Sequence, residues 1–166
     1  MNAEKLRSIT CCFTGHREIL EVDETNVVIW LEEVISQLYL CYSVRYFGSG
    51  GAVGFDILAA EVVLRLAEKY PEIKLILVLP CPEHDKFWNK TWKYRLKEIK
   101  KKAVKIVYTS ANYHKNCMYV RNRHLVDHSG WCIAYCRKNK GGTAYTVLYA
   151  EENHRRVLYF PVEKII

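Results

Sequence analysis

Short apolar runs alternate along the chain with longer segments in which apolar residues recur every three or four positions. The runs are bounded by Gly, Pro or polar residues, which is typical of buried strands. They span residues 8–13, 44–47, 73–79, 104–108, 131–135 and 156–160. The periodic segments predict amphipathic helices. They span residues 24–42, 55–70, 88–103, 119–128 and 143–153.

Strands that alternate with helices in this way predict an α/β protein. We expect a three-layer, Rossmann-like fold whose mostly parallel sheet, of about six strands, is covered by helices on both faces. Local signals set the expected boundaries. Asp23 is a suitable N-cap for helix 24–42. Pro71 should end helix 55–70, and Pro80 and Pro82 should end strand 73–79.

The length and composition are those of a soluble protein with one domain. The 166 residues suffice for one full core, so we expect residues 1–166 to form a single domain. No apolar run approaches the ~20 residues of a membrane span, and the first residues lack the apolar segment of a signal peptide. Seven scattered cysteines are typical of a reducing compartment without structural disulfides. These features predict a cytoplasmic protein without a membrane partner.

The net charge of +7 is concentrated in one segment. The residues between Lys86 and Lys105 include nine Lys or Arg against a single acid, Glu98, so the rest of the chain is close to neutral. An apolar stripe recurs at helical spacing in the same segment and consists of Trp88, Trp92, Leu96, Ile99 and Ala103. The simpler interpretation is a helix with its tryptophans inward and its lysines in solvent. The alternative is a weak, salt-sensitive and sequence-independent contact with nucleic acid.

Four loops follow predicted strands and should meet where the parallel strands end. They span residues 14–17, 48–54, 110–116 and 138–143. The 48–54 loop holds four of the eight glycines, and a glycine pair stands in the 138–143 loop. Glycine lets a ligand approach the backbone closely, and helix N-termini behind such loops present free N–H groups. One glycine loop is also explained by a tight turn, but two at matching sheet positions favour a phosphate site.

Basic side chains near these loops add positive charge. Arg17 suits two-point recognition of phosphate, although a surface arginine is the simpler interpretation. Arg121 and Arg123 lie about 200° apart on their predicted helix, so only one of them can face the loops. The candidate ligand-binding residues are Gly15, His16, Arg17, Gly48, Ser49, Gly50, Gly51, Gly54, Asp56, Arg121, Asn122, Gly141, Gly142 and Thr143.

Several common motifs are missing from the sequence. The frame Ser49-x-Gly51-x-x-Gly54 departs from the dinucleotide fingerprint G-x-G-x-x-G, and Pro71 takes the place of its acidic residue. Neither a phosphate loop ending in Gly-Lys-Ser/Thr nor the G-x-S-x-G elbow of serine hydrolases occurs. His124 and His128 have a chelating spacing but no third ligand, so we expect no metal site.

An ordered set of segments resembles a known family. The segments are CCFTGHR, SGGAVGFDILAAE, IKLILVLPCPEHDKFW, YVRNRHLVDHS and GGTAYTVLYA, and the resemblance extends from Cys11 to Phe160. In this order they resemble the YpsA-like branch of the SLOG superfamily, which is named after the Smf/DprA and Lonely-guy proteins. The resemblance implies a Rossmann-like fold that binds nucleotides or nucleotide-derived ligands.

The Lonely-guy members are phosphoribohydrolases, in which the motif P-G-G-x-G-T-x-x-E and an arginine on the preceding helix hold the phosphate. Gly141, Gly142 and Thr143 are similar to a shortened version of this motif, and Arg121 is similar in position to that arginine. Thr146 stands where the motif has its catalytic glutamate. The resemblance therefore lacks the carboxylate that cleavage of a glycosidic bond requires.

Three functions follow from the residues and the resemblance together. The first is binding of a nucleotide, nucleoside phosphate or ADP-ribose-like molecule, with no other cofactor expected. The second is cleavage of the base–sugar bond of a nucleoside monophosphate, for which Arg121, Asp56 and Glu61 are the candidate catalytic residues. The third is single-stranded nucleic-acid binding, because DprA has similar RNR and SGxxxGxD segments. Folds of this family often pair through helices, so a homo-oligomer is compatible with the resemblance.

Overall fold

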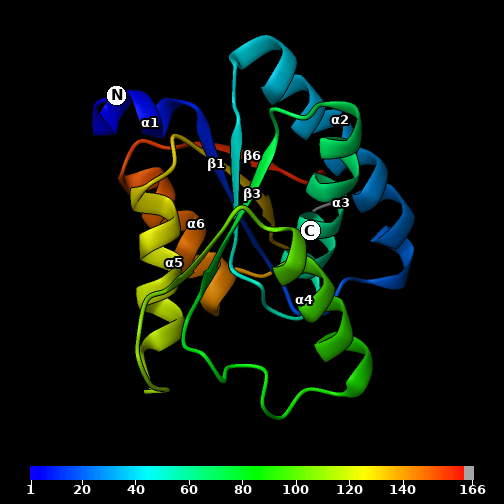
Figure 1. Ribbon diagram of the computed structural model, residues 1–166, viewed down its shortest axis with the longest axis vertical. Helices are drawn as coiled ribbons and strands as arrows, with labels where there is room; N and C mark the ends of the chain where they lie inside the picture. Colours follow the sequence, from blue (N-terminus) through cyan, green and yellow to red (C-terminus); the bar gives the residue numbers. More distant parts are fainter. Residues whose placement is uncertain (163–166) are drawn as a thin grey trace.

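The computed structural model describes residues 1–162 and contains a six-stranded sheet (Figure 1). Its strand order is β4-β3-β2-β1-β5-β6, and every pair of neighbours is parallel. The strands are β1 (Thr10–Gly15), β2 (Tyr46–Ser49), β3 (Lys74–Leu79), β4 (Lys105–Tyr108), β5 (Trp131–Tyr135) and β6 (Arg156–Tyr159). The predicted α/β, Rossmann-like fold is confirmed.

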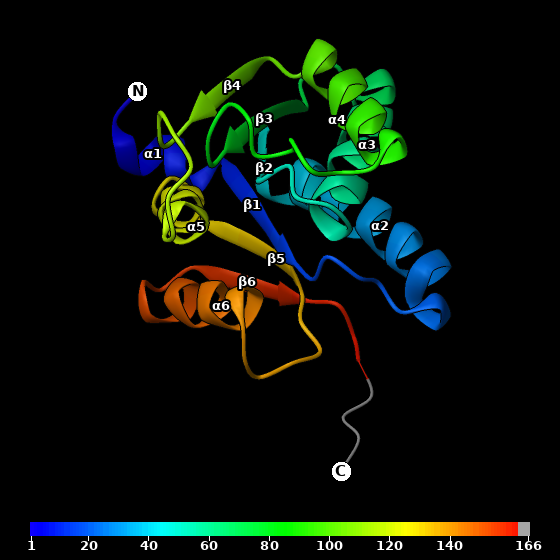
Figure 2. The same ribbon diagram turned by 90° about the horizontal axis from the view of Figure 1, so that it is seen from below.

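Helices form a layer on each face of this sheet, as Figure 2 shows from the end of the molecule. One layer consists of α2 (Glu24–Tyr42), α3 (Phe55–Lys69) and α4 (Lys90–Lys102). The other consists of α1 (Ala3–Ser8), α5 (Cys117–Asp127) and α6 (Gly142–Glu152). A short 3-10 turn, Glu21–Asp23, precedes α2. Within residues 1–162, no helix has the length and apolar character that crossing a membrane requires.

Apolar side chains fill the space on both sides of the sheet. The larger cluster packs around α2 and α3 and includes Phe13, Leu31 and Phe47, all of them buried. The smaller cluster packs under α5 and α6 and includes Leu125 and Ala150. Burial of this much apolar surface is the main source of the stability of the fold.

The apolar stripe of α4 joins the larger cluster, as the simpler interpretation of this basic segment requires. Leu96 and Ile99 are buried, and Trp92 packs partly buried against the same cluster. The helix begins at Lys90, so Trp88 lies before its first turn rather than within it. The Asn89 side chain accepts a hydrogen bond from the N–H of Trp92 and caps the helix.

Two local predictions are wrong. Helix α1 was not expected, and the first strand begins at Thr10 rather than at residue 8. Asp23 does precede α2, but its side chain makes no cap. Its carboxylate instead accepts hydrogen bonds from the Tyr135 hydroxyl at 2.7 Å and from Arg137 Nε at 2.6 Å. The hydroxyl of Tyr135 in β5 and the guanidinium of Arg137 in the loop after it have replaced the local N–H groups as donors.

The strand order places a reversal of direction beside β1. From β1 the chain adds strands outward to β4 and then returns to add β5 on the other side of β1. The loops that follow β1 and β5 therefore diverge to opposite helical layers and leave a crevice between them. Ligands of open α/β sheets bind in such a crevice, beyond the carboxyl ends of the strands.

Candidate functional site

A cavity of about 310 Å³ opens at this crevice. It is lined by residues from four parts of the chain: the end of β1 with its loop, the start of α3, the start of α5 and the loop that leads into α6. We call it the anion cavity. The residues that line it are Phe13, Thr14, Gly15, His16, Arg17, Ala52, Asp56, Met118, Arg121, Asn122, Lys138, Lys140, Gly141, Gly142 and Thr143. Three of the four loops singled out in the sequence thus meet at one hollow, together with the start of α5, the helix that follows the fourth loop.

Arg121 is the most buried cation of the anion cavity, with only 4% of its surface exposed. Its Nη1 donates to the carbonyl oxygen of Gly50, and its Nε donates to Oδ1 of Asn122 at 2.6 Å. Arg123, two residues further on, is exposed. As their angular separation on the helix requires, only one of the two arginines faces the cavity. Arg121 lies on the inner side of α5, and Arg123 lies in solvent.

Asp56 lies in the first turn of α3 and is 6% exposed. Its Oδ2 accepts a hydrogen bond from the N–H of Ala52 at 3.3 Å. Burial raises the pKa of Asp56 to about 6, even though Arg121 and the N–H of Ala52 favour the ionised form. A carboxyl group with this pKa exchanges a proton near neutral pH, as a general acid or base must.

His16 lines the wall of the cavity that β1 provides. Its Nε2 accepts a hydrogen bond from the backbone N–H of Arg137 at 2.8 Å, and its ring packs edge-on against Tyr135. Burial, and then the positive charge of Lys138, lower the pKa of the imidazole. The lowered pKa favours the neutral ring, and because Nε2 accepts this hydrogen bond, the proton of the neutral ring is on Nδ1.

The N-terminus of α6 forms the opposite wall. Gly141 has a φ of +97°, which favours glycine, and the helix begins without a side-chain cap. A Cβ at Gly141 or at Gly142 would meet no atom within 4 Å, so both residues border open space. The first N–H groups of the helix are thus available to a ligand, and the helix dipole favours an anion there.

Several glycine-loop residues predicted to bind a ligand do not line the anion cavity. Gly48 lies within β2, where a Cβ would stand 3.0 Å from Leu125. The Ser49 hydroxyl is fully buried, donates to the carbonyl of Asp56 at 2.8 Å and accepts from the N–H of Gly51 at 3.2 Å. Gly51 and Gly54 have positive φ values of 61° and 89°. The loop geometry thus explains these glycines, and Gly50 is the member of the loop that contacts Arg121.

Glu61, a candidate acid in the sequence, also lies away from the cavity. Its carboxylate forms an ion pair with Arg95 of α4, with Arg95 Nε at 3.1 Å from Oε1. The structure therefore leaves Asp56 as the one carboxylate, among the candidates, that borders the hollow.

The comparisons with known proteins agree with this architecture. The model of the YspA SLOG family, YpsA, matches residues 21–163. The chain belongs to this SLOG family. Protein YoqJ, derived from the SPbeta prophage of Bacillus subtilis, is 28% identical over 133 residues, which are 73% of this chain and 78% of YoqJ. UPF0398 protein BH1768 of Halalkalibacterium halodurans is 24% identical over 119 residues, 70% of this chain and 63% of that protein.

Two solved structures share the fold of this SLOG-family chain. DNA processing protein A (DprA) of Streptococcus pneumoniae superposes with a TM-score of 0.70 at 21% identity over 99% of this chain. DprA of Helicobacter pylori, described for its single-stranded DNA binding mode, superposes with a TM-score of 0.69 at 18% identity over 95% of this chain. The chain spans 54% of the pneumococcal protein and 67% of the other. At these identities the likeness shows a shared fold.

Two cations of the anion cavity, Lys138 and Lys140, were not among the candidates from the sequence. Both are exposed and precede the glycine pair that opens α6. The segment KNKGG could have indicated them, because it places two lysines within three residues before the loop glycines. Met118 was missed as well, since a lone methionine one turn before Arg121 carries no such signal.

The fourth loop, residues 110–116, contributes to a different cavity. Ala111, Asn112 and Tyr113 face residues 81–87 across a hollow of about 740 Å³. His84 connects this region to the glycine loop, because its Nε2 lies 3.3 Å from the carbonyl oxygen of Gly51. The carbonyls of Gly50 and Gly51 are thus held from two directions, by Arg121 and by His84.

The paired histidines of α5 also lie apart from the anion cavity. The His124 and His128 rings stack with their centroids 4.1 Å apart, and Nδ1 of His128 contacts the carbonyl oxygen of His124 at 2.7 Å. Over residues 1–162, no cluster of three His, Cys, Asp or Glu side chains is placed to hold a metal ion.

Proposed function

We propose that the protein binds a nucleotide or nucleoside phosphate, with the phosphate in the anion cavity. The observation that carries the proposal is the convergence of Arg121, two lysines and the uncapped start of α6 on one hollow at the sheet reversal. Arg121 is already ordered by Gly50 and Asn122, so a ligand would meet a pre-positioned guanidinium. Membership of the SLOG family supports a ligand of this class.

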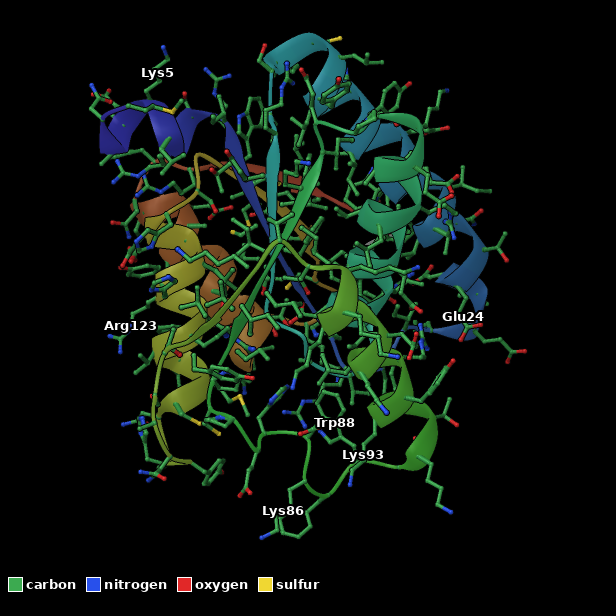
Figure 3. All side chains as sticks on the ribbon, in the orientation of Figure 1. Lys5, Glu24, Lys86, Trp88, Lys93 and Arg123 are labelled. Carbon is green, nitrogen blue, oxygen red and sulfur yellow. The ribbon has the colours of Figure 1, made fainter. Side chains whose placement is uncertain are left out.

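A thermal-shift series with AMP, GMP and ribose 5-phosphate tests the proposal. A ligand at a hundredfold excess over its Kd should stabilise the folded state by about 2.7 kcal/mol. The exposed pair Lys138→Ala and Lys140→Ala should weaken binding several-fold without harm to the fold, because neither side chain is buried. Lys5→Ala is the matched control, since Lys5 lies at the other end of the molecule from Lys86 and the loops after the strands (Figure 3). No shift with any of the three compounds would refute the proposal.

Cleavage of the bound nucleotide is the second candidate function, and Asp56 is the observation that favours it. Its pKa of about 6 suits proton transfer at neutral pH, and its carboxyl borders the anion cavity near Arg121. We expect free adenine to be released from AMP at a rate that Asp56→Asn abolishes while AMP binding persists. Turnover that survives Asp56→Asn would exclude Asp56 as the acid or base.

Nucleic-acid binding is the third candidate, supported by α4 and by the DprA neighbours. Lys93, Lys97, Lys100 and Lys101 of this helix border one hollow of about 520 Å³, whose wall Asp85 and Leu96 complete. Binding to a labelled oligothymidylate should weaken steeply as salt rises, since each phosphate contact releases a counterion. Changing Lys100, Lys101 and Lys102 to Glu should abolish binding, whereas the same change at Lys5, Lys69 and Lys74 should not. Affinity that is indifferent to salt would exclude this contact.

A further inference from the structure

A second cavity, of about 420 Å³, adjoins the anion cavity at Arg17. Arg17 lines both, and no other residue is shared between their linings. The second cavity, here called the Trp92 pocket, lies between the start of α2 and the first half of α4. Arg17, Glu24, Trp92 and Arg95 are among the residues that line it.

Two planar side-chain groups, the guanidinium of Arg95 and the indole of Trp92, stack on each other at the Trp92 pocket. The guanidinium carbon of Arg95 lies over the indole of Trp92, 4.4 Å from the ring centroid. Glu61 holds this guanidinium from α3, with Oε1 and Oε2 at 3.1 and 3.2 Å from Arg95 Nε and a further contact to Nη2. Two-point pairing of this kind fixes the plane of the guanidinium as well as its position.

The Arg95 side chain keeps 29% of its surface exposed. The indole thus covers part of this side chain, and Arg95 also lines the pocket. A fixed guanidinium plane beside an open space is a platform on which a nucleobase stacks. The arrangement needs no rearrangement of Trp92, which stays packed against the core cluster.

The charges of the two cavities differ in a way that orients a nucleotide. In the Trp92 pocket the charge of Arg95 is balanced by Glu61, and the carboxylate of Glu24 also lines the wall. The anion cavity instead gathers Arg121, Lys138 and Lys140 against one carboxyl group, that of Asp56, and Arg17 lines both cavities. A phosphate is therefore favoured in the anion cavity, and an uncharged planar ring in the Trp92 pocket.

We infer that the Trp92 pocket is the base subsite of a bound nucleoside monophosphate, whose phosphate occupies the anion cavity. This inference rests on the proposed nucleotide binding and adds the place of the base. The base stacks on the guanidinium of Arg95, Glu61 acts as a positioning residue for that guanidinium, and Arg17 stands where the two halves of the ligand meet.

Titration calorimetry with AMP and with ribose 5-phosphate separates the two halves of the ligand. Because stacking of one base contributes about 1–3 kcal/mol, the protein should bind AMP about 5- to 150-fold more tightly than ribose 5-phosphate. Arg95→Lys keeps the charge but removes the planar group, so it should bring the affinity for AMP down to that for ribose 5-phosphate. The affinity for ribose 5-phosphate itself should not change.

Arg65→Lys is the matched control, because Arg65 also pairs with a glutamate outside both cavities, its Nε and Nη2 donating to Oε1 of Glu32 at 3.1 and 2.7 Å. It should leave both affinities unchanged. If Arg95→Lys fails to fold by circular dichroism, Glu61→Gln replaces it and should also reduce the preference for AMP.

The outcomes distinguish this inference from the proposed function. Equal affinity of the wild-type protein for AMP and ribose 5-phosphate overturns the base subsite and leaves phosphate binding in place. Loss of both affinities in Arg95→Lys, or of neither, also overturns it. Failure of the wild-type protein to bind either compound refutes the proposed function, and the base subsite falls with it.

Discussion

The guanidinium of Arg121 and the carboxylate of Asp56 both lie against the backbone of Gly50. A Cβ on Gly50 would stand 2.7 Å from Nη1 of Arg121 and 2.7 Å from Oδ2 of Asp56. Yet Arg121 donates to Gly50 and Asn122 rather than to Asp56, whose Oδ2 takes the N–H of Ala52. The two charged groups are neighbours at one cavity without neutralising each other through a direct hydrogen bond, which leaves both able to act on a ligand.

Gly50→Ala should destabilise the protein by about 1–3 kcal/mol, because the new methyl group overpacks the space between these two side chains. Urea denaturation measures the loss. Gly142→Ala is the control, since its Cβ meets no atom within 4 Å and its φ is not positive. An equal loss in both variants would contradict the close packing described at Gly50.

Gly54→Ala should be at least as harmful as Gly50→Ala, for two separate reasons. The φ of Gly54 is +89°, which strains any residue with a Cβ, and the Cβ would collide with the backbone carbonyl of Arg17. Because Arg17 belongs to the wall of both cavities, the displacement should also weaken binding of AMP. Thermal denaturation with and without AMP tests both effects, and a fully stable variant would contradict the described backbone contact.

Asp56→Asn should change how stability depends on pH. The pKa of Asp56 rises from 3.8 to about 6 on folding, so the folded state holds this proton more tightly than the unfolded state. The stability that this group contributes is complete below pH 3.8 and is lost as the pH rises through about 6. Relative to Asp56→Asn, the wild-type protein should lose up to about 3 kcal/mol between pH 4 and pH 7. Parallel pH profiles for the two proteins would contradict the raised pKa.

Tyr135→Phe should cost about 1 kcal/mol, since it removes the hydroxyl that donates to Asp23 at 2.7 Å. Asp23→Ala should cost more, because it also leaves the partly buried Arg137 without its carboxylate. Arg137 lowers the pKa of Asp23, so the stability from this pair is present at neutral pH and lost in acid, as the pH falls through the lowered value. Chemical denaturation at pH 7 and pH 3 measures both effects, and an Asp23→Ala cost that is equal at the two pH values would contradict the pair.

The sequence by itself determined the order and type of most elements. Hydrophobic periodicity is a local property, so it gave helix 24–42 and strand 131–135 with the bounds that the structure has. The phase of α5 likewise required that only one of Arg121 and Arg123 turn inward, and the structure shows that it is Arg121. The alternation of elements then implied a parallel sheet, because helical crossovers return the chain to the same end of the sheet.

Only the tertiary structure decided which loop residues meet. Glu61 and Asp56 look equivalent along the chain, but Glu61 pairs with Arg95 on α4, 34 positions away, while Asp56 turns to the anion cavity. Asp23 was expected to serve its own helix and instead pairs with Arg137, 114 positions away. Which partner a side chain pairs with depends on distance in the folded structure and on charge, and the strand order brings these partners close. The spacing of residues along the sequence therefore does not predict these pairs.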